Sequence, residues 1–257
     1  MLFINEEKHY LLEIEFYFTN DIHPDPYTHC NPAQKSAGKW YFHVDKNKNG
    51  EYVYREEQFA GVDISIGDEA GGSGGILIRS VKHVKTNKIY CGPGQVMEHI
   101  VNLAGCNTVA EMVRTHFSEL SPDVLNVDRM SSYMYLFFSD EKRKKPKIYD
   151  TPRIGLFLTK RTIDLSVQVH YMLQHYRFVT DVNLLWKNKH YLVYRLHMTG
   201  VPVNNIRQIL SMDGKKVQEL VNSYEAGRLE RSLEGYTRRL AVETELLKCF
   251  GICNSII

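Results

Sequence analysis

The sequence predicts a mixed α+β protein, in which a strand-rich region precedes a shorter helical region. Most segments from residue 9 to about 185 are short runs of aromatic and β-branched residues separated by Gly, Pro or Asn, which is typical of strands. Two segments within this region, 92–105 and 108–120, repeat apolar residues at helical spacing. After about residue 193, helical patterns dominate. The 257 residues suffice for one fair-sized domain and a small second one.

The elements of the strand-rich region are expected in a defined order. The predicted strands cover residues 9–18, 39–44, 51–54, 59–66, 74–84, 153–160 and 188–196. The apolar side of the two predicted helices consists of Val96, Ile100, Val101 and Leu103, and of Val109, Met112, Val113 and Phe117. The charged segment 139–152 contains two prolines and is expected to be a loop.

The region after residue 200 predicts three helices. Residues 201–212 and 213–227 form two helix patterns, and a longer pattern runs from Leu229 to Phe250. The first two patterns resemble a helix-turn-helix, whose second helix would present polar residues outward to DNA. These outward residues are Lys215, Lys216, Gln218 and Asn222. A helical hairpin that only packs on the main domain fits the same spacing.

Composition and charge exclude several classes of protein. The chain has no run of about 18 apolar residues, and its N-terminus lacks a basic stretch followed by an apolar one, so we expect a soluble, intracellular protein. Five cysteines without a C-x2-C pair favour reduced thiols over disulfides or structural zinc. The net charge of +2 does not by itself indicate nucleic acid, so any DNA contact must come from a local patch.

Three motifs that suggest a metal or a nucleotide have simpler explanations. Segment 45–56 matches a calcium-loop pattern, but predicted strands flank it and its Asn-Gly pair favours a hairpin. Segment 67–75 is rich in glycine but lacks the Lys-Ser/Thr of a phosphate loop. His23, His29 and Cys30 have no second ligand pair at a suitable spacing, so we expect no metal and no cofactor.

The predicted strand 10–18 carries polar groups on one face. With period two, Leu12, Ile14, Phe16 and Phe18 point one way, and Glu13, Glu15 and Tyr17 point the other. Such a polar face is typical of the solvated side of an edge strand. However, Arg79 stands in an otherwise apolar predicted strand, where it needs a carboxylate partner or a pocket. The two strands together therefore also fit a functional site.

Eight short blocks resemble the alkyladenine (3-methyladenine) DNA glycosylase family, in that family's order. They are EIEFY (13–17), DPYTHC (25–30), YVY (52–54), GVDIS (61–65), GGILIRS (74–80), CGPGQV (91–96), TPRIGL (151–156) and HYRFV (175–179). The resemblance implies a strongly curved antiparallel β-sheet with flanking helices. It also implies a monofunctional enzyme that flips one base out of duplex DNA and hydrolyses the bond to its sugar, leaving an abasic site.

The resemblance assigns roles to five residues. Glu15 corresponds to the general base and Arg79 to the arginine that helps hold the attacking water. Tyr17 and His29 correspond to the aromatic residues that sandwich the flipped base, and Tyr54 to a third wall of its pocket. A carboxylate suits this reaction, because it stabilises an oxocarbenium-like sugar and accepts a proton from water.

Two positions depart from the family pattern. Asp63 replaces an asparagine of the pocket floor, and an ionised Asp accepts hydrogen bonds only, which favours a base with an amino group. The tyrosine that the family inserts into DNA is absent, so either Gln58 or Phe59 fills the gap or the base is flipped in a different way. Arg177 is expected to contact DNA. The substrate would be an alkylated base or a hypermodified viral or phage base.

The sequence thus predicts a glycosylase domain over residues 1–190 and a helical region over residues 191–257 that adds DNA affinity through Lys215 and Lys216. The expected partner is double-stranded DNA with a modified base, bound by a monomer, without a membrane. The alternative is a nucleic-acid-binding module of the same fold without catalysis, because fold alone does not carry function.

Overall fold

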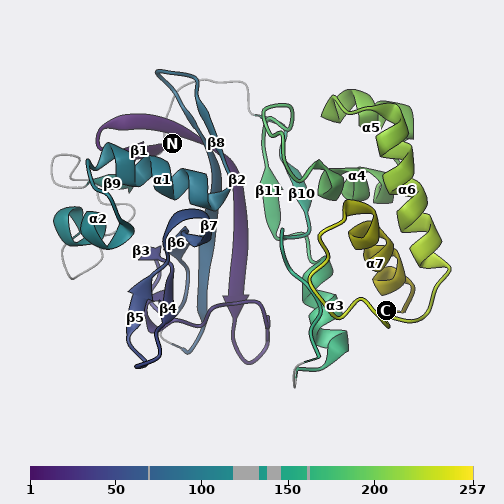
Figure 1. Cartoon of the computed structure of the whole chain (residues 1–257), viewed down its shortest axis with the longest axis horizontal. Helices are drawn as coiled ribbons and strands as arrows, with labels where there is room; N and C mark the ends of the chain where they lie inside the picture. Colours follow the sequence, from purple (N-terminus) through teal and green to yellow (C-terminus); the bar gives the residue numbers. More distant parts are fainter. Residues whose placement is uncertain (69, 118–132, 138–145, 161–162, 257) are drawn as a thin grey trace. The chain divides into compact units, whose positions relative to one another are not determined.

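The computed structural model describes residues 1–68, 70–117, 133–137, 146–160 and 163–256 (Figure 1). It confirms a mixed α+β protein with a curled antiparallel sheet and, in the described ranges, seven helices. The chain forms two compact units. The first comprises Met1–Pro24 with Thr28–Pro146, and the second comprises Asp25–Tyr27 with Lys147–Ile257.

The sheet of the first unit is built around two long antiparallel strands, β2 (Glu7–Thr19) and β7 (Ser73–His83). The shorter strands that pair with them, directly or through a neighbour, are β1 (Leu2–Ile4), β3 (Trp40–Phe42), β6 (Val62–Ser65), β8 (Ile89–Cys91) and β9 (Met134–Leu136). From β2 the order continues through β7 and β6 to β3. These pairings are antiparallel, as predicted.

A β-bulge in β2 changes which side chains share a face. The register shifts between Leu11 and Ile14, so that Leu11 lies opposite Val81 and packs against the core. Strict alternation places Leu12, not Leu11, on the apolar face. Leu12 is indeed buried, at 2% exposed, but the prediction misses Leu11, because a bulge sets two residues of one strand against one of its partner.

Two helices and one side of the sheet enclose the core of the first unit. Helix α1 (Pro93–Leu103) contributes Val96 and Ile100, and helix α2 (Val109–His116) contributes Met112, all fully buried. Both predicted helices are confirmed, the second as far as His116; residues 118–120 of the predicted segment lie outside the described ranges. Helix α2 begins where the Thr108 side chain accepts a hydrogen bond from the Glu111 amide, which is a normal N-cap.

A separate hairpin joins β4 (Val44–Lys46) to β5 (Tyr52–Tyr54). Gly50 in its turn has a φ of 82°, a conformation that glycine adopts without strain. The hairpin confirms the interpretation of the Asn-Gly pair and leaves no helices to flank a calcium loop. Two 3-10 turns, η1 (Pro32–Gln34) and η2 (Glu57–Phe59), lie before and after this region.

The second unit is mainly helical. Its strands are β10 (Tyr149–Thr151) and β11 (Arg177–Val179), and its helices are α3 (Leu165–Leu173), α4 (Lys189–Met198), α5 (Val203–Leu210), α6 (Gly214–Arg228) and α7 (Glu243–Ile256). Strand β10 falls in the segment predicted as a loop. Residues 139–145 of that segment lie outside the described ranges.

Two predicted strands of this unit are wrong. Residues 153–160 form a turn and irregular chain, with Gly155 at a φ of 80°. Residues 189–198 form helix α4, which is buried on several sides by residues such as Tyr191, Val193 and Leu196. Aromatic and β-branched residues suggested a strand here, because a helix that is buried nearly all round shows no amphipathic period.

Helices α5 and α6 lie where two helices were predicted. They are joined by a three-residue turn, in which Ser211 has a φ of 50° and the Asp213 side chain caps α6. The third predicted helix begins too early. Residues 230–242 form turns around Gly235, whose φ is 82°, and α7 starts only at Glu243.

The compact units and the predicted domains divide the chain at different residues. Residues 147–190 pack with the C-terminal helices, whereas the sequence grouped them with the glycosylase domain. The predicted division concerns function, which packing alone does not test. In the described ranges, no helix has the length and apolar character needed to cross a membrane.

Candidate functional site

Glu15, Tyr17 and Arg79 meet on one face of the sheet. The Tyr17 hydroxyl donates to Glu15 Oε2 at 2.8 Å, and Arg79 Nη1 donates to the same oxygen at 3.2 Å. Strands β2 and β7 produce this contact because Glu15 lies directly opposite Leu77 and Arg79 follows two residues later on the same face. The sequence predicted these three residues as a group, and the structure brings them together.

Glu13 extends this cluster. Its carboxylate accepts hydrogen bonds from Arg79 Nε at 3.2 Å and from the Ser80 hydroxyl. Glu15 is fully buried, Glu13 is 3% exposed and Arg79 is 8% exposed. The interpretation of this face as the solvated side of an edge strand is therefore wrong. Two buried carboxylates beside one guanidinium leave a net negative charge that must be balanced by further donors or by protons.

Asp63 lies on the same face, one strand further along the sheet. Asp63 pairs with Leu77, which in turn pairs with Glu15, so the three residues form a row across β6, β7 and β2. A Cβ atom on Gly75 would lie 2.5 Å from Asp63 Oδ2. Because glycine has no Cβ atom, the Asp63 carboxylate can occupy this space.

The Asp63 carboxylate is bound on both oxygens. Oδ1 lies 2.8 Å from His43 Nε2, and Oδ2 accepts from Gln34 Nε2 at 3.1 Å. Both Asp63 and Gln34 are buried, and Arg79 pairs with Glu13 and Glu15. A direct contact from Asp63 to a base would require one of its two bonds to break.

We predict that Asp63→Asn destabilises the first unit by about 1–3 kcal/mol, because the new amide NH2 faces a donor on either side. It would meet His43 Nε2–H or the Gln34 amide, and His43 would have to move its proton to Nδ1. Urea unfolding measures the loss, and the imidazole ¹⁵N shifts of His43 report the tautomer. Asp68→Asn, on an exposed turn, is the matched control. Equal stability and an unchanged His43 spectrum would contradict the assignment.

His29 lies beside the Asp63–His43 pair. Its ring centroid is 5.2 Å from that of His43, and its Nε2 accepts from Arg55 Nη2 at 3.1 Å. Burial, reinforced by the neighbouring His43 and Arg55, lowers the pKa of His29 to about 4. His29 is therefore a neutral aromatic ring at neutral pH, which suits contact with an uncharged heterocycle.

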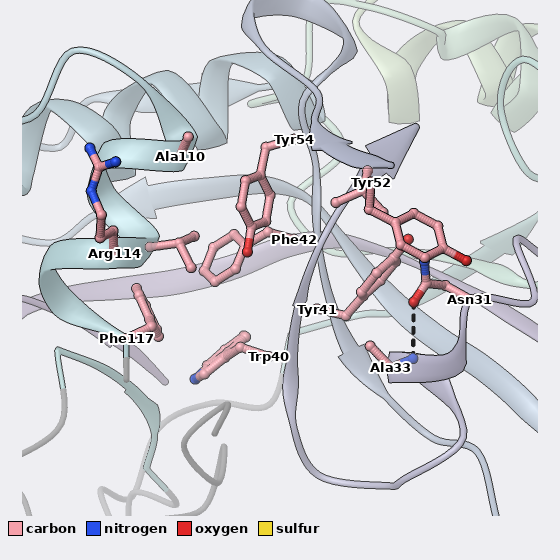
Figure 2. A pocket seen from close by; sticks show the side chains of 12 residues that line it. Asn31, Ala33, Trp40, Tyr41, Phe42, Tyr52, Tyr54, Ala110, Arg114 and Phe117 are labelled. Atoms are coloured by element: carbon pink, nitrogen blue, oxygen red, sulfur yellow. Dashed lines mark hydrogen bonds between the residues drawn. The ribbon is translucent and has the colours of Figure 1, made fainter. Parts of the chain in front are cut away.

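The structure does not group Tyr54 with Glu15 and Tyr17. Tyr54 packs against the core cluster and lines a separate pocket beside α2 (Figure 2). His29 lines an adjoining pocket of about 310 Å³, in which its aromatic neighbours are Tyr41 and Tyr52. Sequence analysis missed these two tyrosines. Alternation along β3 could have indicated Tyr41, because it lies between the core residues Trp40 and Phe42 and should face the other side of the sheet. In the structure it lies opposite Asp63.

The two candidates for the missing inserted tyrosine are both exposed. Gln58 and Phe59 lie in η2, shortly before β6, and Phe59 is 66% exposed. A Cβ atom on Gly94 would lie 2.7 Å from Gln58 Cα, so α1 packs closely beneath this turn. Phe59 is thus a large apolar side chain held outward by a supported turn.

The predicted DNA-contacting cations differ in position. Arg177 is 1% exposed and donates to the Thr151 hydroxyl at 3.1 Å, so it has a structural place inside the second unit. Lys215 is exposed at the start of α6. Lys216 is half-buried and lies 3.4 Å from both Glu219 and Glu243. Of these three residues, Lys215 has the most accessible position for a phosphate contact.

A cluster of buried histidines lies elsewhere in the first unit. His9 Nε2 is 2.8 Å from His99 Nε2, the His9 and His83 rings stack, and His83 contacts the Glu7 carboxylate. Burial, reinforced by the neighbouring histidines, lowers the pKa of both His9 and His99 to about 4. In the described ranges, no group of His, Cys, Asp or Glu has the arrangement of a metal site.

These depressed pKa values predict acid instability. The unfolded chain binds a proton on each histidine near pH 6.5, whereas the folded protein resists protonation until about pH 4. Stability should therefore fall as the pH decreases through this window, by at most about 1.4 kcal/mol per pH unit for each histidine. Urea unfolding at pH 7.5, 6 and 5 measures the slope. His99→Gln should reduce the slope of stability against pH by the contribution of one histidine. His170→Gln, at an exposed position on α3, should leave the slope unchanged. Equal slopes in the two variants would contradict this prediction.

The comparisons with known proteins place the chain in a family. It is 36% identical to the uncharacterized protein L759 of Acanthamoeba polyphaga mimivirus over 172 residues, which span 60% of this chain and 72% of that protein. The chain belongs to the same family as this mimivirus protein. No family model matches the sequence. Since the mimivirus protein is itself uncharacterized, this relationship does not assign an activity to the chain.

Proposed function

We propose that this protein is a monofunctional DNA glycosylase that uses Glu15 to activate water. The observation that carries the proposal is the contact of Glu15 with both Arg79 and Tyr17 across β2 and β7. A buried carboxylate that faces a guanidinium and a phenol has the components for holding one water molecule and accepting its proton. The same negative charge would stabilise the positive sugar that forms as the base leaves.

The neighbouring groups support handling of a flipped base. The row from Glu15 through Leu77 to Asp63 puts a second buried carboxylate, that of Asp63, two strands away from the proposed general base. His29 is a neutral ring near this row. Exposed Phe59 fits the role of a wedge, because bulky apolar side chains inserted between base pairs compensate the lost stacking when a base leaves the helix.

A non-catalytic DNA-binding protein is the second candidate. It is favoured by the complete burial of Glu15, whose carboxylate is already satisfied by Tyr17 and Arg79. In that case the Glu15 cluster would be a structural ion-pair network. The two candidates differ in a single measurable quantity, the release of free base from DNA.

The test is to incubate the protein with duplexes that each contain one alkylated, deaminated or hypermodified base, and then to cleave abasic sites with alkali. The proposal expects strand cleavage at one class of base in the wild-type protein and none in Glu15→Gln. Binding of every duplex without cleavage would support the binding module. Activity that persists in Glu15→Gln would assign the general base to another residue.

Helices α5 and α6 are proposed to add DNA affinity as a helix-turn-helix. The three-residue turn and the exposed Lys215, Gln218 and Asn222 support this role. A second helix that presents polar residues in this way can enter the major groove. The Gln218 amide donates to Asn222 at 2.8 Å, which holds both side chains on one exposed face.

We predict that Lys215→Gln weakens DNA binding and reduces the salt slope, d log K/d log [salt], by about one unit, because one phosphate contact is lost. Fluorescence anisotropy at several salt concentrations measures both quantities. Lys187→Gln, which removes the same charge outside α5 and α6, is the matched control. An unchanged salt slope in Lys215→Gln would contradict the proposed DNA contact and would mean that these helices serve only in packing.

A further inference from the structure

The structure contains a hollow that the Glu15 chemistry does not use. It wraps around β3, the last strand in the order β2, β7, β6 and β3, and is bounded on the other side by the β4–β5 hairpin. Its larger compartment has a volume of about 800 Å³ and its smaller one about 310 Å³. The compartments adjoin each other, because Asn31, Tyr41, Val44 and Tyr52 line both.

The larger compartment is aromatic. Figure 2 shows Tyr54, Phe42 and Trp40 around the space beside α2, with Asn31 and Ala33 at the other end. Phe42 is 5% and Trp40 is 1% exposed, and the Trp40 indole donates to the Met134 carbonyl at 2.9 Å. These rings are fixed by the core, so the compartment is preformed rather than created on binding.

The smaller compartment is polar and cationic. Arg55 and Lys46 line it, and Asp45 is its acidic residue, already paired with Arg55 at 2.7 Å. Lys46 Nζ lies 5.4 Å from the centroid of the Tyr52 ring, which lines both compartments. His29 adds no charge, because its pKa is lowered to about 4. Arg114 on α2 adds a third cation to the larger compartment.

We infer that this hollow binds a nucleotide, with the base against the aromatic compartment and the phosphate in the cationic one. Three cations and one carboxylate among the described lining residues favour an anionic ligand. Six aromatic residues line the larger compartment, and of these Tyr52 and Tyr54 keep part of their rings exposed, so they can bind any base by stacking. A ligand that is planar and apolar at one end and anionic at the other satisfies both compartments.

The inference is independent of the proposed glycosylase activity, because Glu15 does not line either compartment in the described part of the chain. The nucleotide can be free or part of a single strand. Both sources present the same chemistry, so the experiment compares them directly. Binding is measured without any cleavage, and therefore a failure of the catalytic proposal would leave this result interpretable.

The experiment uses the fluorescence of Trp40 in a Trp186→Phe background, which removes the other of the two tryptophans. Adenosine 5′-monophosphate, thymidine 5′-monophosphate, adenosine, inorganic phosphate and an oligothymidylate single strand are titrated separately. We expect both monophosphates to quench Trp40 and adenosine to bind about tenfold more weakly. Inorganic phosphate should not quench. Tighter binding of the oligothymidylate than of the monophosphates assigns the site to nucleic acid, and equal binding assigns it to free nucleotides.

Two variants test the location. Ala110 is exposed on α2 and lines the aromatic compartment, so Ala110→Trp fills the space without removing a core side chain; its own added indole makes calorimetry the readout. We expect it to lower nucleotide affinity at least about tenfold, with an unchanged thermal unfolding midpoint. Lys46→Gln should weaken the monophosphates several-fold but not adenosine. Lys48→Gln, on the same hairpin but outside both compartments, is the control.

The inference is overturned if neither the monophosphates nor the oligothymidylate bind at millimolar concentration. It is equally overturned if a folded Ala110→Trp protein binds them with wild-type affinity, because the aromatic compartment would then not be the site.

Discussion

If the proposed glycosylase activity is present, Glu15→Gln should reduce base release by about 10²–10⁴-fold on a modified duplex from which the wild-type protein releases the base. The substitution keeps the size of the side chain and its capacity to accept a hydrogen bond from Tyr17, but it removes the negative charge and the proton acceptor. Single-turnover release of free base measures the chemical step directly. The affinity for the duplex should stay within about threefold of the wild-type value. Glu15 is buried, and as a carboxylate it contributes no attraction to the DNA phosphates.

Glu13→Gln is the matched comparison for this prediction. It removes a second buried carboxylate from the same guanidinium, but Glu13 accepts from Arg79 and Ser80, whereas Glu15 accepts from Arg79 and Tyr17. We expect a smaller loss, through altered positioning of Arg79. If Glu13→Gln reduces base release more than Glu15→Gln, the roles of the two carboxylates must be exchanged.

Arg153→Met should destabilise the second unit by about 3–5 kcal/mol, because it leaves the Asp25 carboxylate buried without its ion partner. Arg153 Nη1 and Nη2 donate to the two oxygens of Asp25 at 2.6 and 3.1 Å, and both side chains are fully buried. Arg153 Nη2 also donates to the Tyr171 carbonyl. Urea unfolding, followed by the emission of Trp186 in this unit, measures the loss.

The double variant Asp25→Asn/Arg153→Met should be more stable than Arg153→Met alone, because the buried charge is removed together with its partner. The amide introduced by Asp25→Asn would still accept the hydrogen bond that Asp25 accepts from the Tyr27 backbone. Arg231→Met, at an exposed arginine, should change stability by no more than about 0.5 kcal/mol. A loss below about 1 kcal/mol in Arg153→Met would mean that Asp25 becomes protonated or solvated when its partner is absent.

The candidate site was predictable where its residues are close in sequence or carry an obvious chemical conflict. Glu15 and Tyr17 share a face because they are two residues apart on a strand, and Arg79 is a charge in an apolar run that requires a partner. The pairing of Asp63 with His43 was not predictable. It depends on the registers of β3, β6 and β7 and on the space above Gly75, none of which the sequence shows.

The sequence by itself determined the elements with a clear local period, such as β2, α1 and α2, since alternation and helical spacing express which side of an element is buried. Only the tertiary structure decided α4, which is buried on nearly all sides and so lacks that period. Only the tertiary structure also joined Asp25 to Arg153, 128 residues apart. The physical reason is the same in both cases: local spacing reports burial on one face, whereas burial on all faces and long-range ion pairs arise only when distant segments pack together.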